Sequence, residues 1–371
     1  MRGSGFWVRA MARPRTEEMP SIFEREGTAA GGCSGREAPT RVRGSGFWVR
    51  AMARPRTEEM PSIFEREGTA AGCVLRARSA HAHPESGYRV PLVQVLEGRL
   101  GELRWRYLPR QPPARLRPFV RAMAAYEERA PGWVHRRELP HPGLVMIVEL
   151  EPAIRVESEG TLRPFGRGFV AGIGGRPSLT VYDRHQRGLQ VDLSALGARA
   201  LFAVDGAELA GRVVGLEELG WGHLAERLAE APDWPSRFAF VDRAFEERLA
   251  GAGDLRVARW LLEAVEASGG QRPIAELVAE SGYSHGYLGR LCRRDLGLTP
   301  KRLSQLVRFQ RLVQRMRGAP QGPSGDVGAP TLARLAAELG YADHSHLVRE
   351  VRLWSGVAPS ELEALVAPAL V

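Results

Sequence analysis

The chain has 371 residues, 44% of them hydrophobic, and a formal net charge of +9. Its apolar runs fall far short of the roughly 20 residues that span a bilayer, and no apolar signal-peptide core follows the first residues. Three cysteines are too few for a disulfide framework or a four-ligand zinc site. The sequence therefore excludes a membrane span, a disulfide scaffold and structural zinc, and we expect a cytoplasmic protein.

The positive charge lies at the two ends of the chain. Residues 1–81 hold 14 basic and 9 acidic residues, residues 82–254 hold 23 of each, and residues 255–371 hold 15 and 11. All the basic residues except Lys301 are arginine. A neutral centre between basic ends predicts different functions for the three segments.

The beginning of the chain contains a duplication, because residues 2–31 recur letter for letter as residues 43–72. Proline, glycine and charged residues interrupt every apolar cluster, and two copies are fewer than a stable solenoid needs. So few apolar residues cannot offset the entropy of ordering the chain. We therefore predict a mostly disordered tail over residues 1–86; the alternative is a basic arm that follows DNA.

The middle segment, residues 87–253, has the pattern of a mixed α/β domain. Residues 118–129 have apolar positions at helical spacing and predict a helix, and further helices are predicted at 221–230 and 236–249. Short apolar runs between glycine- and proline-bearing turns predict strands at 144–150, 178–182, 189–193 and 200–204. We expect a regulatory domain that senses a ligand or dimerises, followed by a linker at 251–253.

A glycine cluster in this segment superficially matches a dinucleotide-binding motif. Residues 172–175 read GIGG, and Asp192 follows about 20 residues later. The third glycine position of the motif is Pro177, and a strand rather than a helix is predicted after it. These are turn glycines, and we expect no cofactor.

The last third of the chain contains a second, diverged repeat. Residues 274–303 align with residues 332–362 at twelve positions when the second copy is given one extra residue after its Gly-Tyr pair. Each copy predicts a short helix, a tight turn and a second helix. Gly282 and Gly340 are suited to end the first helix, and Ser284 and Asp343 to cap the second.

The second helix of each copy has an apolar face and a polar face. A basic, polar helix that follows a short capped turn is typical of a helix that enters the major groove of DNA. A helix over 301–317 would join the two copies, and residues 318–330 predict a loop. The candidate DNA-binding residues are Ser284, His285, Gly286, Gly289, Arg290 and Arg293 in the first copy, and Asp343, His344, Ser345, His346, Arg349 and Arg352 in the second.

These motifs make residues 255–366 similar to the AraC/XylS family of bacterial transcription regulators. The resemblance is carried by GYSHGYLGRLCRRDLGLTP (282–300), RFQR (308–311) and GYADHSHLVREVRLWSGVAP (340–359). It implies two helix-turn-helix units joined by a long helix, with both recognition helices in successive major-groove segments. By this resemblance, the base-reading positions are Gly286, Gly289, Arg290, Ser345, His346 and Arg349.

The expected fold class is therefore α+β. A β-rich mixed N-terminal domain, which resembles that of some family members, precedes an all-α tandem helix-turn-helix domain over 254–371. The expected function is sequence-specific binding of double-stranded DNA in transcription regulation, modulated by the N-terminal domain. RNA polymerase, a small-molecule effector and a second copy of the chain are the further partners that this hypothesis includes.

Two alternatives stay open. Gly286 and Gly289 have no side chain with which to contact bases. The protein could therefore be a module that senses a small molecule or partner and has weak DNA specificity. The second alternative is a DNA-repair methyl acceptor fused to this kind of DNA-binding domain. That chemistry needs an activated cysteine, whereas Cys292 is expected on the inward face of its helix. We expect neither an enzyme nor a bound metal.

Overall fold

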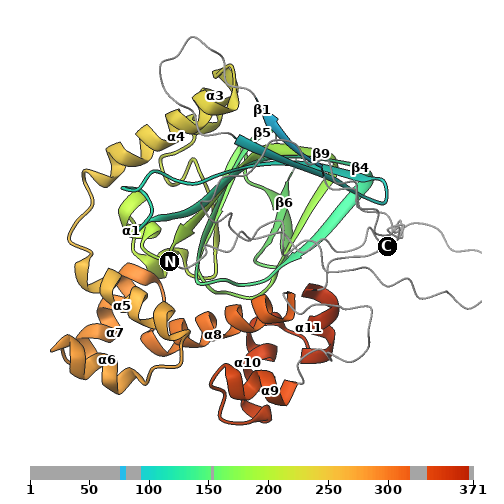
Figure 1. Cartoon of the computed structure of the whole chain (residues 1–371). Coiled ribbons are helices and arrows are strands. Elements are labelled where there is room, and N and C mark those ends of the chain that lie inside the picture. Colours follow the sequence, from blue (N-terminus) through green and yellow to red (C-terminus); the bar gives the residue numbers. More distant parts are fainter. Residues whose placement is uncertain (1–75, 81–92, 152–153, 318–331, 367–371) are drawn as a thin grey trace, which may run out of the picture.

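The computed structural model describes residues 76–80, 93–151, 154–317 and 332–366 (Figure 1). Most of the predicted tail and the predicted loop at 318–330 lie outside these ranges. Residues 76–80 correct the tail prediction, because Arg76–Ala80 form strand β1, which pairs with β2 (Val93–Leu100). No helix in the described part is long and apolar enough to cross a membrane.

The N-terminal part, which we call the sheet region, is one curved antiparallel sheet with the strand order β1-β2-β3-β4-β9-β5-β8-β10 (Figure 1). A hairpin of β6 and β7 is attached to β9. The remaining strands are β3 (Leu103–Arg110), β4 (Val120–Glu138), β5 (Gly143–Glu151), β6 (Arg155–Ser158), β7 (Thr161–Pro164), β8 (Gly168–Ala171), β9 (Ser178–Ser194) and β10 (Val213–Gly215).

Two predictions for this region are wrong. Most of the helix predicted at 118–129 belongs to β4, which pairs with β3 and β9 and has buried residues on both faces, such as Ala122 and Met123. A strand buried on both faces has a nearly continuous apolar run, which also satisfies helical spacing. The strand predicted at 200–204 overlaps helix α1 (Gly197–Leu201) and the turn after it.

The main core of the sheet region lies between one face of the sheet and helices α1, α3 (His223–Glu230) and α4 (Trp234–Leu249). Both α3 and α4 overlap their predicted positions. Trp221 lies at the centre of this core, with its ring 5.4 Å from Phe245 and 6.1 Å from Phe202, both in edge-on geometry. Leu189, Val191 and Leu193 of β9 complete the core from the sheet side, and short helix α2 (Gly206–Leu209) follows α1.

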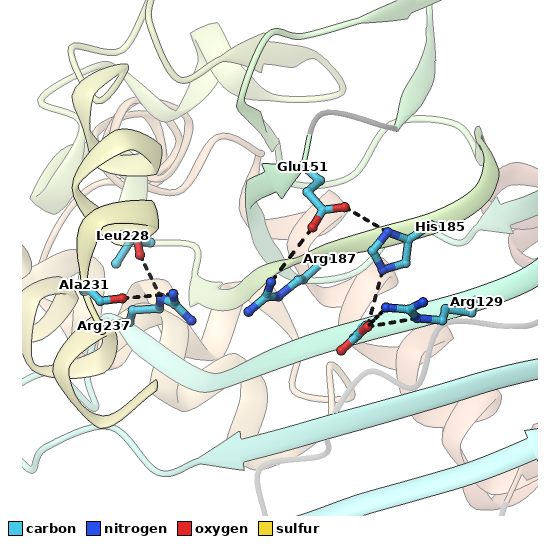
Figure 2. Close-up of polar contacts among 8 residues, drawn as sticks. Arg129, Glu151, His185, Arg187, Leu228, Ala231 and Arg237 are labelled. Carbon is cyan, nitrogen blue, oxygen red and sulfur yellow. Dashed lines mark hydrogen bonds and ion pairs between the residues drawn. The ribbon is translucent and has the colours of Figure 1, made fainter. Parts of the chain in front are cut away.

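Beyond this core, the helix-covered face of the sheet continues into a polar network (Figure 2). His185 lies between two carboxylates, with Nδ1 2.8 Å from Glu151 and Nε2 3.4 Å from Glu127. Arg129 donates to Glu127, and Arg187 lies 3.9 Å from Glu151.

One arginine ties the two covering helices of this face together. In Figure 2, Arg237 of α4 donates from Nε to the carbonyl of Leu228 at 2.7 Å and from Nη2 to that of Ala231 at 2.9 Å. These carbonyls belong to the end of α3, where helical backbone acceptors lack partners within the helix. Arg237 therefore fixes the end of α3 to α4.

The helical region, residues 256–366, lies along one end of the sheet region (Figure 1). Its core contains Leu277, Leu291, Phe309 and Leu347, and continues into Ile173 of the sheet region. A β-rich part is thus followed by an all-α part, which confirms the predicted fold class. The helices are α5 (Arg256–Ser268), α6 (Ile274–Ser281), α7 (His285–Leu296), α8 (Pro300–Arg317), α9 (Leu332–Glu338), α10 (His344–Ser355) and α11 (Pro359–Val366).

Candidate nucleic-acid interface

Two helix-turn-helix units make up the candidate interface, α6–α7 and α9–α10, joined by α8. Gly282 and Gly340 follow the first helix of each unit with φ of 70° and 73°, the left-handed conformation that glycine adopts without strain. The Ser284 side chain accepts from the amide of Tyr287 at 3.2 Å, and Asp343 accepts from the amide of His346 at 2.6 Å. The predicted helix ends and caps are confirmed.

The second helix of each unit buries its apolar face and exposes the polar one. In α7, Leu288, Leu291 and Cys292 are buried, and in α10, Leu347 and Val351 are buried. The candidate residues exposed on the opposite faces are Ser284, His285, Gly286, Arg290 and Arg293 in the first unit, and Asp343, His344, Ser345, Arg349 and Arg352 in the second; Gly289 is half-buried.

Four of these arginines differ from most of the others in the helical region, because no carboxylate pairs with them within the described ranges. Within the described ranges, no hydrogen bond or ion pair involves the side chains of Arg290, Arg293, Arg349 or Arg352. Most other arginines of the helical region are paired with carboxylates: Arg256 with Asp254, Arg272 with Glu280, Arg294 with Asp295, Arg308 with Glu350, and Arg315 and Arg334 with Glu338. Exposed cations without a carboxylate partner therefore lie on α7 and α10, and also on α8 at Lys301, Arg302 and Arg311. On α7 and α10 they occupy equivalent positions, where they favour an anionic partner.

The structure gives His346, a candidate base reader, an internal role. Its Nδ1 accepts from the amide of Ala342 at 3.2 Å, so Nε2 carries the proton and donates to Glu350 at 3.1 Å. Glu350 is 2% exposed and also accepts from Nη2 of Arg308 at 2.9 Å. These contacts hold the N-terminal end of α10 against α8, and they leave His346 half-buried.

The two units differ at their equivalent tyrosines. Tyr341 is 5% exposed and lies under the Arg308 guanidinium, 5.1 Å from its ring centroid. Tyr283, in contrast, is 43% exposed and stacks on Tyr287 with ring centroids 4.7 Å apart. The first unit therefore has an exposed aromatic pair where the second unit has a buried ring.

Gly286 is the second residue of α7 and Gly289 lies in its interior, and neither has a positive φ. A Cβ atom added at Gly289 would meet nothing within 4 Å, and one added at Gly286 would meet only Nη1 of Arg290, at 3.5 Å. At position 289, in the helix interior, glycine destabilises the helix by about 1 kcal/mol relative to alanine. Within the described part of the chain, no neighbouring atom requires glycine at either position.

Cys292 is unsuited to act as a nucleophile. The side chain is buried on the inner face of α7, as predicted, and it is a free thiol. Burial, with a smaller contribution from Asp295, raises the pKa of the thiol to about 12. Because the thiolate is the reactive form, this environment opposes methyl-acceptor chemistry.

The C-terminal end of α7 packs against the sheet region. Gly206, at the start of α2, approaches Gly297, the residue that ends α7, so closely that a Cβ atom on Gly206 would lie 2.5 Å from the Gly297 amide nitrogen. Arg199 of α1 donates to Asp205 at 2.7 Å and lies 3.6 Å from the buried Asp295 of α7. We call this group the α2–α7 clasp: Arg199, Asp205, Gly206, Asp295 and Gly297.

A loop of the sheet region also contacts the helical region. Residues 172–175, between β8 and β9, place Gly174 so that an added Cβ would lie 3.5 Å from Leu298 and 3.8 Å from Trp354. The same loop lines a cavity of about 100 Å³ inside the curved sheet. The other side chains around the cavity are mixed in character, and include Arg137, Glu138, Ile147, Phe169, Arg176 and Gln190.

The comparison with known protein families finds a match in the helical region. Residues 277–364 match the family model described as "Helix-turn-helix domain". The match covers both units and α8, and the helical region is a helix-turn-helix DNA-binding domain of the AraC type. The class that the fold and this match define is accordingly a protein with a C-terminal helix-turn-helix domain.

Solved structures similar to this chain include two of ToxT. The structure of ToxT from Vibrio cholerae O395 covers 71% of this chain and 98% of its own, with 10% identity and a TM-score of 0.36. Unsaturated fatty acid bound wild-type ToxT from Vibrio cholerae strain SCE256 covers 64% and 96%, with 9% identity and a TM-score of 0.37. The AraC-like transcriptional activator CuxR covers 65% and 86%, with 14% identity and a TM-score of 0.22. No curated protein sequence matches the chain.

Proposed function

We propose that the protein is a bacterial cytoplasmic transcription regulator that binds a two-part DNA site with α7 and α10. The observation that carries this proposal is the set of four exposed, uncompensated arginines at equivalent positions of two capped helices: Arg290, Arg293, Arg349 and Arg352. Helices of this kind fit the major groove. In this proposal, residues 254–371 are the DNA-binding domain and residues 87–253 the regulatory domain.

The arginines of each helix have separate roles. Arg290 and Arg349 would read base edges, since a bidentate arginine contact to guanine contributes about 1–3 kcal/mol of discrimination. Arg293 and Arg352 lie nearer the helix C-terminal ends and would neutralise phosphates, which makes affinity fall as salt rises. His285, His344 and Ser345 would add polar contacts, whereas Ser284, Asp343 and His346 would orient the helices through the hydrogen bonds described above.

The sheet region would modulate DNA binding through its contacts with the helical region. The α2–α7 clasp fixes the end of one recognition helix, and the loop at 172–175 lies between the cavity and residues Leu298 and Trp354. A small molecule in the cavity would bias the position of this loop. RNA polymerase and a second copy of the chain remain proposed partners of the regulator.

The test is a selection of bound fragments from sheared genomic DNA by the full chain, washed at graded salt. We expect two short sequence blocks centred roughly 10 bp apart, because the recognition helices enter successive groove segments. In the same selection, Arg349→Ala should change one block, because Arg349 would read bases. Arg315→Ala removes an arginine that is paired with a carboxylate, so it is the matched control and should recover the same blocks as the unmodified chain. Recovery of only random fragments that salt removes would contradict sequence-specific regulation.

One observation favours the second candidate, a sensing module with weak DNA specificity. The first recognition helix presents two glycines where side chains would otherwise read bases. If this candidate is correct, the selection recovers one block at most, and the substitution Arg290→Ala leaves the recovered sequences unchanged. Loss of a block in the Arg290→Ala selection would exclude it.

A further inference from the structure

The two glycines of α7 have no explanation inside the described protein. Gly289 faces open space, and the space beside Gly286 contains only the guanidinium of Arg290. Glycine at position 289, in the helix interior, weakens the helix, and a partner that approaches the backbone from outside would offset this cost. The face that carries the glycines is the one that also carries Arg290 and Arg293.

The position of Arg290 connects these glycines to DNA. Its Nη1 atom lies 3.5 Å from the Cβ position of Gly286, so the side chain runs back along α7 towards the N-terminal end. Recognition helices contact base edges mainly with residues of that end. A side chain larger than that of alanine at position 286 would therefore compete with the Arg290 guanidinium for the space beside the N-terminal end of α7.

The equivalent face of α10 is built differently. The alignment of the two units pairs Gly286 with Ser345 and Gly289 with Val348, because Arg290 pairs with Arg349. Ser345 is exposed and Val348 is half-buried, so side-chain atoms stand between the α10 backbone and any partner. The backbone of α7 can therefore approach a partner more closely than the backbone of α10 can.

We propose that Gly286 and Gly289 are specificity-determining residues of the first unit, which let α7 enter the major groove more deeply than α10 and keep Arg290 aligned with its base pair. This inference rests on the proposed function, since the DNA site itself is defined by the two units and their arginines. The glycines decide how one of the two helices sits in that site.

The test compares Gly289→Ala, Gly286→Ala and Gly286→Leu in the full chain, on the DNA fragment that the unmodified chain selects. Alanine has no clash to overcome at either position. Gly289→Ala, in the helix interior, should therefore unfold at a temperature a few degrees higher, and Gly286→Ala, in the first turn, should gain less. Gly289→Ala should nevertheless bind the fragment at least tenfold more weakly. Gly286→Leu should displace Arg290 and change the preferred base pair in the first block only.

Ser345→Ala and Val348→Ala are the matched controls in α10, and neither should change the first block. The inference is overturned if Gly289→Ala is more stable and binds the fragment with unchanged affinity, and if Gly286→Leu selects the same first block. In that case the proposed function still stands. If the unmodified chain selects no fragment at all, the proposed function fails, and this inference fails with it.

Discussion

The two helix-turn-helix units share a pattern of turns and caps but are anchored to different parts of the molecule. The α6–α7 unit is held by the α2–α7 clasp, which joins it to the sheet region. The α9–α10 unit is held to α8 by the buried network of Arg308, Glu350 and His346. A duplicated motif can thus keep one local geometry while its two copies are held by different contacts. In the proposed function, the first unit would respond to the sheet region and the second would present a fixed reading surface.

The largest expected effect comes from breaking the anchor of the second unit. Glu350→Ala leaves Arg308, only 12% exposed at its side chain, without its carboxylate partner. Removal of one partner from a buried ion pair costs about 3–5 kcal/mol. We expect the free energy of unfolding, measured in urea, to fall by an amount near the lower end of this range, since Arg308 keeps its hydrogen bond to the Gly270 carbonyl.

The control for this prediction is Glu338→Ala. Glu338 pairs with Arg315 and Arg334 at the surface, and exposed pairs contribute about 1 kcal/mol or less. If the free energy of unfolding falls equally in the two variants, the Glu350 network does not anchor the second unit.

The next effect concerns the reading surface of the second unit. Arg349→Ala should lower discrimination in one sequence block by about 1–3 kcal/mol. The free energy of unfolding should not change, because the side chain is exposed and has no hydrogen bond or ion pair within the described ranges. Binding competition between matched and mismatched fragments measures the difference. A uniform loss of affinity for every sequence would instead make Arg349 a phosphate contact.

A smaller effect should follow from opening the clasp of the first unit. Arg199→Ala removes the side chain that links Asp205 and Asp295. Arg294 still donates to Asp295 at 2.7 Å, so we expect the free energy of opening the first unit to fall by only about 1 kcal/mol. Cys292 offers a direct measurement, because its buried thiol, with a pKa of about 12, reacts with iodoacetamide only when the unit opens. Alkylation should be several times faster in Arg199→Ala.

Arg227→Ala removes a surface pair with Glu230, distant from α7 in sequence, and serves as the control. If Cys292 reacts at the same rate in all three proteins, the clasp does not stabilise the first unit.

The smallest effect is expected at the exposed aromatic pair of the first unit. Tyr283→Ala removes the stacked contact with Tyr287, and aromatic pairs contribute about 0.5–1.5 kcal/mol beyond area burial. Because both rings are partly exposed, we expect the free energy of unfolding, measured by thermal unfolding, to fall by an amount at the low end of this range. Tyr341→Ala, at the buried equivalent position, should be several times more destabilising. Similar losses would contradict the difference between the two units.

The helical region could be predicted from the sequence because its signals are local. Glycine after a short helix, an oxygen-bearing cap and apolar spacing all act within a few residues, as at Gly282, Ser284 and Leu288. The internal repeat then showed that the pattern occurs twice. These properties predicted the helices, their caps and the exposure of the candidate arginines.

What the sequence could not show depends on partners distant along the chain. β4 was predicted as a helix because its strand partners, β3 and β9, decide its conformation. The sequence also did not show that His346, a predicted base reader, contacts Glu350, which is oriented by Arg308, 42 residues away. A carboxylate four residues after a histidine on the same helix face was the available signal for this contact.

The contact between Gly206 and Gly297 also limits how this protein could be recombined with others. Neither position tolerates even a methyl group, since the added atom would lie within 3 Å of backbone or side-chain atoms across the boundary. A chimaera that joins this sheet region to another helix-turn-helix domain therefore needs glycine on both sides of the junction. In a hybrid built without this pair, the added Cβ atoms would force α2 and the end of α7 apart.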